Sequence, residues 1–258
     1  MILYLKLKNM KINILHVKAI LVVSVLNLAQ ATLFSQITDP KATEVWEPEP
    51  RKVTPGLNHM PPSDAIILFN GSNMDEWTDL KGNPSPWQIT EGFLTVVPKK
   101  GDIKTKKVFG DCQIHIEWRA PSLVKGEGQG RGNSGIFLQE KYELQVLDSY
   151  DNRTYSNGQA ASIYKQSMPL VNVMNKPGEW QVYDIIYKAP RFNKDGILVS
   201  PPTITVLHNG VLVQNNTEIK GSTEYIGLPG FKAHEKGSLR LQDHGDLVSF
   251  RNIWIREL

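Results

Sequence analysis

Cysteine is almost absent from this chain. Among 258 residues there is one, Cys112, so no intrachain disulfide can form. Its position at the start of an alternating apolar segment predicts that it packs in the core rather than acting as a nucleophile. The sequence also lacks the H-E-x-x-H zinc motif, the phosphate-binding P-loop and the G-x-S-x-G nucleophile elbow. Its six histidines are dispersed, without the spacing of a metal-ligand pair. A divalent metal ion held by separate strands, for example by His244 and Glu143, stays open.

Long apolar runs are missing beyond the N-terminus. The one such run, residues 19–29, follows four lysines and ends in an Ala-Gln-Ala sequence, which is the layout of a secretory signal. It is too short to span a bilayer comfortably, because spanning takes roughly 20 apolar residues. We expect residues 1–31 to be a signal peptide, with export to the periplasm or the outside of a bacterium. No stable membrane insertion is expected after cleavage; an uncleaved anchor is the alternative.

A strong excess of one charge is lacking as well. The precursor has a formal net charge of +3. The expected signal peptide holds four lysines and no acidic residue, so the mature chain falls to 3 − 4 = −1. Nucleic-acid binding depends on clustered Lys and Arg. We therefore expect no nucleic-acid partner.

Amphipathic helices longer than a few turns are also missing, whereas strands and turns are frequent. Residues 32–62 contain six prolines and little periodicity, which predicts an extended lead-in. In residues 63–258, hairpin turns are predicted at Glu91-Gly92, at 139–141 and at Asn209-Gly210. Short strands at this spacing favour an all-β domain, a β-sandwich or a related antiparallel architecture.

Three of the predicted strands carry rows of polar side chains opposite apolar rows. Because side chains alternate along a strand, each row lies on one face. The rows are Glu143 and Gln145; His115, Glu117 and Arg119; and Arg240, Gln242 and His244. They could simply face water, since antiparallel sheets commonly have one wet face. Alternatively they line a site, because these groups bind polyols and move protons. In the second case, the glycine-rich loop at 126–135 would aim Arg131 and Asn133 at the ligand.

Six segments appear in the order found in one known family. They are LFNGSNMDEW (68–77), FGDCQIHIEWRAP (109–121), GQGRGNSGIFLQEKYELQVLDSY (128–150), GEWQVYDIIYKAPRF (178–192), VLHNGVLVQ (206–214) and LRLQDHGDLVSFRNIWIREL (239–258). Over residues 64–258 the chain resembles the secreted bacterial 3-keto-glycoside lyase/hydratase family, also called 3-keto-disaccharide hydrolases. The resemblance implies a concanavalin A-like (lectin/glucanase) jelly-roll β-sandwich over 63–258.

The same resemblance implies a glycoside substrate that a partner sugar 3-oxidoreductase has already oxidised at C3. A 3-ketone acidifies the hydrogen on C2, so a general base can remove it; the enolate then expels the C1 substituent, and water can add afterwards. His244 is the expected base, and Glu143 is a competing base or the acid for the leaving group. Arg131, Arg119 or a divalent metal would stabilise the enolate.

The remaining polar residues have both functional and structural interpretations. Asn133, Gln145 and Gln242 would hold sugar hydroxyls, with Glu117, Arg119 and Arg240 nearby; alternatively Glu117 and Arg240 form a cross-strand ion pair. The contrasting function is a non-catalytic lectin-like carbohydrate-binding module, because the same scaffold hosts both. A structural protein without a site would leave His244 and Glu143 far apart.

Overall fold

The computed structural model describes residues 39–258, so the expected signal peptide lies outside the described residues. Contacts divide the chain into two units, Met1–Lys52 and Val53–Leu258. In the first unit, the described residues form one short 3₁₀ helix, η1 (Pro40–Thr43), whose first turn is capped by the Asp39 side chain. Within residues 39–258, no helix is long and apolar enough to cross a membrane.

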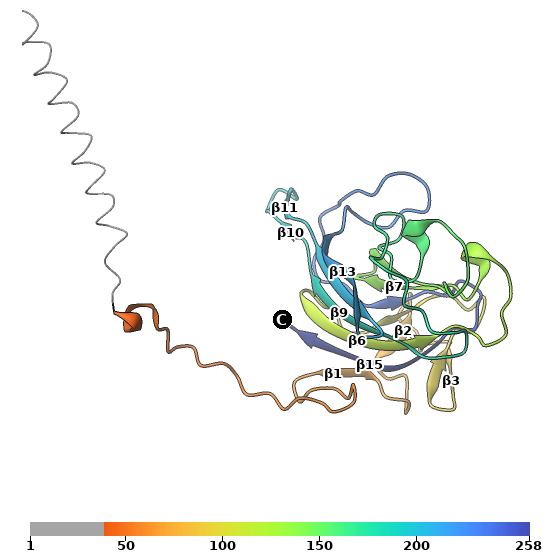
Figure 1. Ribbon diagram of the computed structural model, residues 1–258, viewed down its shortest axis with the longest axis horizontal. Helices are drawn as coiled ribbons and strands as arrows, with labels where there is room; N and C mark the ends of the chain where they lie inside the picture. Colours follow the sequence, from red (N-terminus) through yellow and green to blue (C-terminus); the bar gives the residue numbers. More distant parts are fainter. Residues whose placement is uncertain (1–38) are drawn as a thin grey trace, which may run out of the picture. The chain divides into compact units, whose positions relative to one another are not determined.

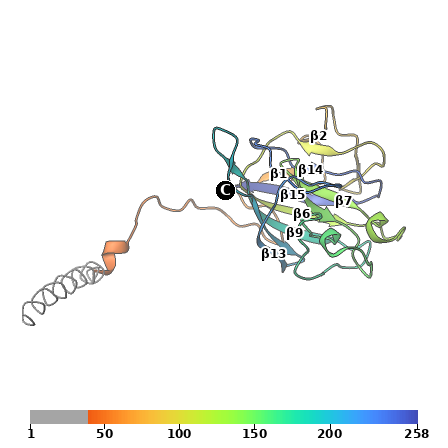
Figure 2. The same ribbon diagram turned by 90° about the horizontal axis from the view of Figure 1, so that it is seen from above.

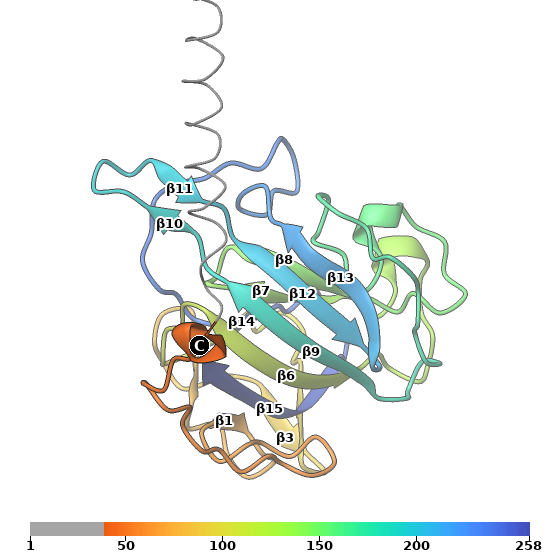
Figure 3. The same ribbon diagram turned by 60° about the vertical axis from the view of Figure 1, so that its left-hand side comes forward.

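The second unit consists of two antiparallel sheets (Figure 1). The larger sheet has the order β13-β12-β9-β6-β15-β4-β3, with β1 also pairing with β15. Its strands are β1 (Ile66–Phe69), β3 (Gln88–Thr90), β4 (Phe93–Thr95), β6 (Cys112–Arg119), β9 (Gln181–Lys188), β12 (Thr203–His208), β13 (Val211–Glu218) and β15 (Ser249–Glu257). Figure 3 shows β13, β12, β9, β6 and β15 side by side.

The smaller sheet has the order β2-β5-β14-β7-β8. Its strands are β2 (Trp77–Asp79), β5 (Ile103–Thr105), β14 (Arg240–Leu241), β7 (Ser134–Leu138) and β8 (Tyr142–Val146). Seen from above, β14 and β7 lie over β15 and β6 (Figure 2), so the two sheets form separate layers. A two-stranded hairpin, β10 (Arg191–Phe192) and β11 (Leu198–Ser200), and two 3₁₀ turns, η2 (Gly128–Gly130) and η3 (Ser156–Gly158), complete the elements. The all-β sandwich expected from the sequence is confirmed.

The predicted hairpin turns are present. Asn209 and Gly210 both have positive φ, 52° and 79°, as a two-residue turn between β12 and β13 requires. Gln139 and Glu140 also have positive φ and connect β7 to β8. Glu91-Gly92 connects β3 to β4 in the same way.

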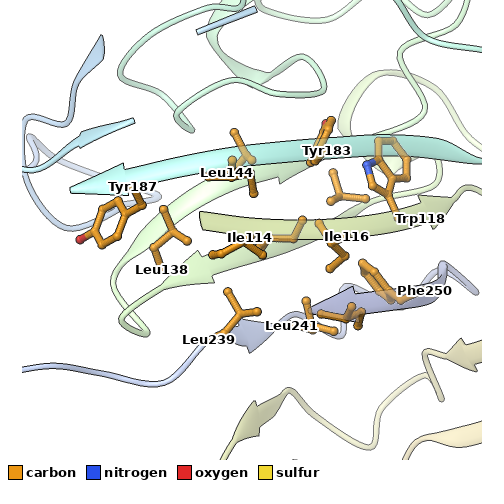
Figure 4. Packing of buried hydrophobic residues seen from close by; sticks show 14 of the residues in the cluster. Ile114, Ile116, Trp118, Leu138, Leu144, Tyr183, Tyr187, Leu239, Leu241 and Phe250 are labelled. Atoms are coloured by element: carbon orange, nitrogen blue, oxygen red, sulfur yellow. The ribbon is translucent and has the colours of Figure 1, made fainter. Parts of the chain in front are cut away.

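The core fills the space between the two sheets. Ile114, Ile116 and Trp118 of β6 point towards Leu144 of β8 and Leu241 of β14 (Figure 4). All five side chains are buried, as strand alternation predicts for the apolar rows. Cys112 belongs to the same cluster, so its predicted packing role is confirmed; burial raises the pKa of its thiol to about 12.

Strand β8 ends the smaller sheet, but a loop covers its free edge. The Gln145 N–H donates to the Ser162 carbonyl, Ala161 N–H donates to the Gln145 carbonyl, and Tyr164 N–H donates to the Glu143 carbonyl. Edge strands expose unpaired backbone groups unless something pairs with them. The pairing therefore fixes the segment 161–164 directly beside Glu143.

Candidate functional site

Two polar rows of the sequence meet on the outer face of the smaller sheet. The register of β14, β7 and β8 places side chains in two neighbouring cross-strand rows, Arg240–Phe137–Glu143 and Gln242–Gly135–Gln145. Alternation turns these side chains away from the core, into which Leu241, Ile136 and Leu144 point. The polar face predicted for β8 and the predicted face of 240–244 are thus one continuous surface.

A pocket of about 640 Å³ opens over these rows. Such a volume suits a small organic ligand. It is lined by Gln129, Gly130, Asn133, Phe137, Glu143, Gln145, Tyr155, Tyr164, Lys165, Thr223, Tyr225, Gln242 and His244. Five residues predicted from the sequence are therefore brought together: His244, Glu143, Asn133, Gln145 and Gln242. His244 and Glu143 border the same cavity, which is not the arrangement expected of a protein without a site.

Glu143 supplies the carboxyl group of this pocket, and its pKa is strongly shifted. Its side chain is only 5% exposed, because the segments 161–164 and 222–225 lie against its strand. Burial raises the pKa of Glu143 to about 8, although Arg240 acts in the opposite direction and Asp102 adds to the rise. At neutral pH the carboxyl group is therefore mostly protonated and can donate a proton. The alternative that this face simply meets water is wrong.

Two amide oxygens in the pocket lack a protein partner. The Gln145 side chain is 1% exposed, and its amide group donates to the side-chain oxygen of Gln129 at 2.9 Å. That bond leaves the Gln145 Oε1 buried without a donor, and Gln242 Oε1 is in the same state. Buried polar atoms are almost always paired, so an unpaired acceptor beside a cavity indicates a ligand that donates. Sugar hydroxyls are such donors.

Gly135 lies between the two glutamines in its cross-strand row and leaves room for the Glu143 carboxyl group. A Cβ atom at this position would lie 2.7 Å from Glu143 Oε1 and 2.8 Å from Phe137 Cε2. Any side chain here would displace the acid. The glycine is thus required by the close approach of the carboxyl group to the sheet.

The open side of the pocket is formed by three tyrosines and a lysine. The Tyr155 and Tyr164 hydroxyl oxygens are 2.7 Å apart. The Lys165 ammonium donates to the Tyr225 carbonyl at 2.6 Å and lies 4.3 Å from the centre of the Tyr225 ring. Lys165 also has a positive φ of 56°, and backbone strain of this kind is concentrated at functional sites. Sequence analysis missed these four residues because they lie in loops, where no periodicity marks a face.

Arg131 does not reach this pocket. Its Nε donates to Asp148 Oδ2 at 2.7 Å and one of its terminal nitrogens donates to the Tyr150 carbonyl at 2.9 Å. It lines a different cavity, of about 290 Å³, together with Asp148. The ion pair with a buried partner holds the guanidinium there. The expectation that the glycine-rich loop aims Arg131 at the same ligand as Asn133 is therefore corrected.

Glu117 and Arg119 belong to the other sheet. Strand β6 lies between β9 and β15, so its polar row faces the outside of the larger sheet. Glu117 pairs with Arg251 at 2.6 Å, and Arg119 stacks over Phe93, 4.5 Å from the ring centre. Placing them with the other polar rows was wrong, because strand parity does not tell which sheet a strand joins.

The suggested Glu117–Arg240 ion pair is likewise absent among the described residues. Arg240 pairs instead with Asp102 at 2.9 Å and its guanidinium lies 3.7 Å from the centre of the Phe137 ring. Arg240 is not among the residues that line the pocket, although it pairs across the sheet with Phe137, which does line it. Its charge lowers the pKa of Glu143, so it influences the site through this acid rather than by contact with the ligand.

The pocket is a poor site for a resident metal ion. Its described lining residues supply one imidazole, His244, and one carboxyl group, Glu143. A carboxyl ligand must be deprotonated, and the raised pKa of Glu143 opposes this. Elsewhere in the described residues, ligand atoms of His59, in the turn before β1, and of His115 and Asp184, on the larger sheet, lie within 4.8 Å of one another. His115 Nδ1 is already hydrogen-bonded to Asp184 there, at 2.7 Å.

Fold and pocket together define a β-sandwich protein with a polar, sugar-sized site on the outer face of one sheet. Residues 64–256 match the family described as 3-keto-alpha-glucoside-1,2-lyase-like domain. The chain therefore belongs to this family, and the resemblance noted in its sequence is confirmed.

Similarity to individual proteins agrees with this family membership. A 3-keto-disaccharide hydrolase of Bacteroides thetaiotaomicron is 28% identical, over 75% of this chain and 78% of the relative. A crystal structure of a candidate glycosyl hydrolase from Parabacteroides distasonis is 54% identical, with a TM-score of 0.82 over 85% of this chain and 97% of that one. A second candidate glycosyl hydrolase from P. distasonis, 23% identical with a TM-score of 0.57 over 76% of this chain and 94% of that one, shares the fold.

Proposed function

We propose that this protein cleaves 3-keto-glycosides by removing the C2 proton and eliminating the C1 substituent. The observation that carries the proposal is the buried carboxyl group of Glu143, protonated at neutral pH, beside unpaired amide acceptors in a sugar-sized pocket. Membership of the lyase-like family supports the same substrate class. The relative named 3-keto-disaccharide hydrolase suggests that net hydrolysis is one outcome.

Glu143 and His244 divide the proton transfers between them. His244 is exposed at the pocket and takes the C2 proton as general base. Glu143 gives its proton to the departing C1 oxygen, since its raised pKa keeps it protonated. The electron pair from C2–H forms the C2–C3 double bond of an enolate, with the negative charge on O3. An electron pair of O3 then re-forms the C3 carbonyl, the C2–C3 π pair moves to form the C1–C2 double bond, and the C1–O bond breaks, its electron pair leaving with the oxygen that Glu143 protonates. Water that later adds across this bond gives net hydrolysis.

The enolate oxygen needs a positive group. Of the described residues lining the pocket, Lys165 has the ammonium group that could fill this role, in place of Arg131 and Arg119. Gln145 and Gln242 accept hydrogen bonds from sugar hydroxyls and orient the ring. The ketone at C3 is supplied by a separate sugar oxidoreductase, and the protein acts after export from the cell.

The test uses a 3-keto glucoside with a chromogenic leaving group. Wild-type protein is expected to release the chromophore, whereas Glu143→Gln and His244→Ala lose at least about a hundredfold in kcat/KM. Glu140→Gln is the matched control, because Glu140 lies in the adjacent turn, pairs with Lys104 and is outside the pocket lining. Release by wild type that both variants retain would refute the assigned roles. Addition of a chelator tests for a metal requirement.

A lectin-like binding module is the second candidate, and the tyrosines at the pocket opening favour it. Aromatic side chains commonly support sugar rings in binding sites, and Tyr155 and Tyr225 are both exposed. A binding module would retain unoxidised glycosides without turning over the 3-keto forms. Calorimetry with both forms of the same glucoside separates the two functions.

A further inference from the structure

The tyrosines at the mouth of the pocket point to a leaving-group subsite. We propose that this subsite, formed by Tyr155, Tyr164 and Tyr225, binds an aromatic aglycone. The proposal rests on the proposed function, because it assigns a partner to the C1 substituent of the same substrate. It adds the chemical class of that substituent.

Two of the three segments of the subsite, those of Tyr164 and Tyr225, are hydrogen-bonded to the backbone of the proposed acid. The Tyr164 N–H donates to the Glu143 carbonyl at 3.1 Å, and the Glu143 N–H donates to Thr223 Oγ1 at 2.9 Å. An acid that protonates the glycosidic oxygen must contact the atom to which the aglycone is attached. The side chains that flank Glu143 on the solvent side are therefore the ones that the aglycone meets.

The polar floor and the aromatic mouth of the pocket differ in chemistry. The unpaired acceptors, Gln145 Oε1 and Gln242 Oε1, are buried at the floor and suit a ring rich in hydroxyl groups. At the mouth, the hydroxyls of Tyr155 and Tyr164 bond to each other and so offer fewer contacts to a second sugar. The ring faces of the three tyrosines are what the mouth offers instead, and they favour stacking by a flat aromatic group.

The subsite is exposed in a way that a packing role does not explain. Tyr225 is 72% exposed and Ile226 is 83% exposed, although neighbouring Gly221 is buried and Thr223 N–H is bonded to the Lys141 carbonyl. The loop is thus anchored while its large side chains remain uncovered. The Lys165 ammonium lies 4.3 Å from the Tyr225 ring centre and donates to the Tyr225 carbonyl, so the ring borders the pocket beside it. An aromatic aglycone would stack on the free ring face.

The experiment compares 3-keto phenyl glucoside, 3-keto methyl glucoside and a 3-keto disaccharide with full-length protein. In Tyr225→Ala, kcat/KM for the phenyl substrate is expected to fall roughly five- to tenfold relative to the methyl substrate. Tyr225→Phe retains the ring and is expected to retain the ratio. Trp46→Ala is the control for loss of an exposed aromatic residue outside the pocket lining, and it should leave the ratio unchanged.

An equal loss for phenyl and methyl substrates would overturn the subsite, because Tyr225 would then serve the sugar or the loop. A selective loss for the disaccharide would overturn the aromatic assignment in favour of a second sugar. Calorimetry with unoxidised phenyl and methyl glucosides keeps the two proposals distinguishable. If no substrate is turned over but phenyl glucoside binds more tightly than methyl glucoside in a Tyr225-dependent way, the lyase proposal fails and the subsite stands.

Discussion

Replacing Glu143 by glutamine should change the pH dependence of stability in a defined direction. Burial raises the pKa of this carboxyl group to about 8 in the folded protein, against an ordinary value of 4.5. Between these values the folded protein binds more protons at this position than the unfolded chain does. The free energy of unfolding therefore falls as pH rises from about 4.5 to about 8.

The size of this change in the free energy of unfolding follows from the difference between the folded and the ordinary pKa of Glu143. A difference of about 3.5 pH units corresponds to about 5 kcal/mol at its full extent, with about two thirds of it reached at pH 7. Glutamine has the same shape and does not titrate. The variant should therefore gain stability relative to wild type as the pH increases, by about 4 kcal/mol between pH 4.5 and pH 8.

Urea unfolding of wild type and Glu143→Gln at several pH values between 4.5 and 8.5 measures this difference. Contributions of all other titrating groups cancel, because both proteins contain them. Glu140→Gln is again the control and should show a much smaller pH-dependent difference, since its carboxylate is solvent-accessible. A wild-type-minus-variant difference that stays constant with pH would refute the burial of an acid at position 143.

Three further predictions concern groups around the site. Glu117→Gln should leave activity unchanged but lower stability by about 1–3 kcal/mol near pH 6. Burial opposes ionisation of Glu117, yet hydrogen bonds and nearby positive charge hold its pKa at about 2. Its contribution to the free energy of unfolding is therefore fully present above pH 4.5 and is lost as the pH falls towards 2. Urea unfolding of wild type and variant at pH 6 and pH 3 measures this contribution. Gly135→Ala should reduce kcat/KM at least tenfold and lower the free energy of unfolding by about 1–3 kcal/mol. Gly230→Ala is the control, because a Cβ at Gly230 would meet no atom within 4 Å, and it should change neither quantity. The activity assay and urea unfolding measure the two effects. Arg131→Ala should destabilise by about 3–5 kcal/mol, because the buried Asp148 carboxylate then loses its charge partner and keeps only the Tyr150 N–H bond. The KM of the folded fraction should stay within about twofold. A large rise in KM with normal stability would show instead that Arg131 contacts the substrate.

The sequence by itself determined the strands, their hairpins and the two faces of each strand. These features depend on local geometry: side chains alternate along an extended chain, and Asn209-Gly210 adopts positive φ at little cost. The polar faces of Glu143 with Gln145 and of Arg240 with Gln242 were therefore predictable. The order of the six quoted segments was not needed for that step, although it supplied the family resemblance.

Only the tertiary structure decided which faces form one site. Strand β14 lies beside β7 and β8, whereas β6 joins the other sheet, and alternation within a strand contains no information about its neighbours. The same holds for Glu143, whose pKa rises because the distant segments 161–164 and 222–225 cover its strand. Burial and charge pairing arise from contacts between residues far apart in the chain, so the chemistry of the acid was set by folding rather than by local sequence.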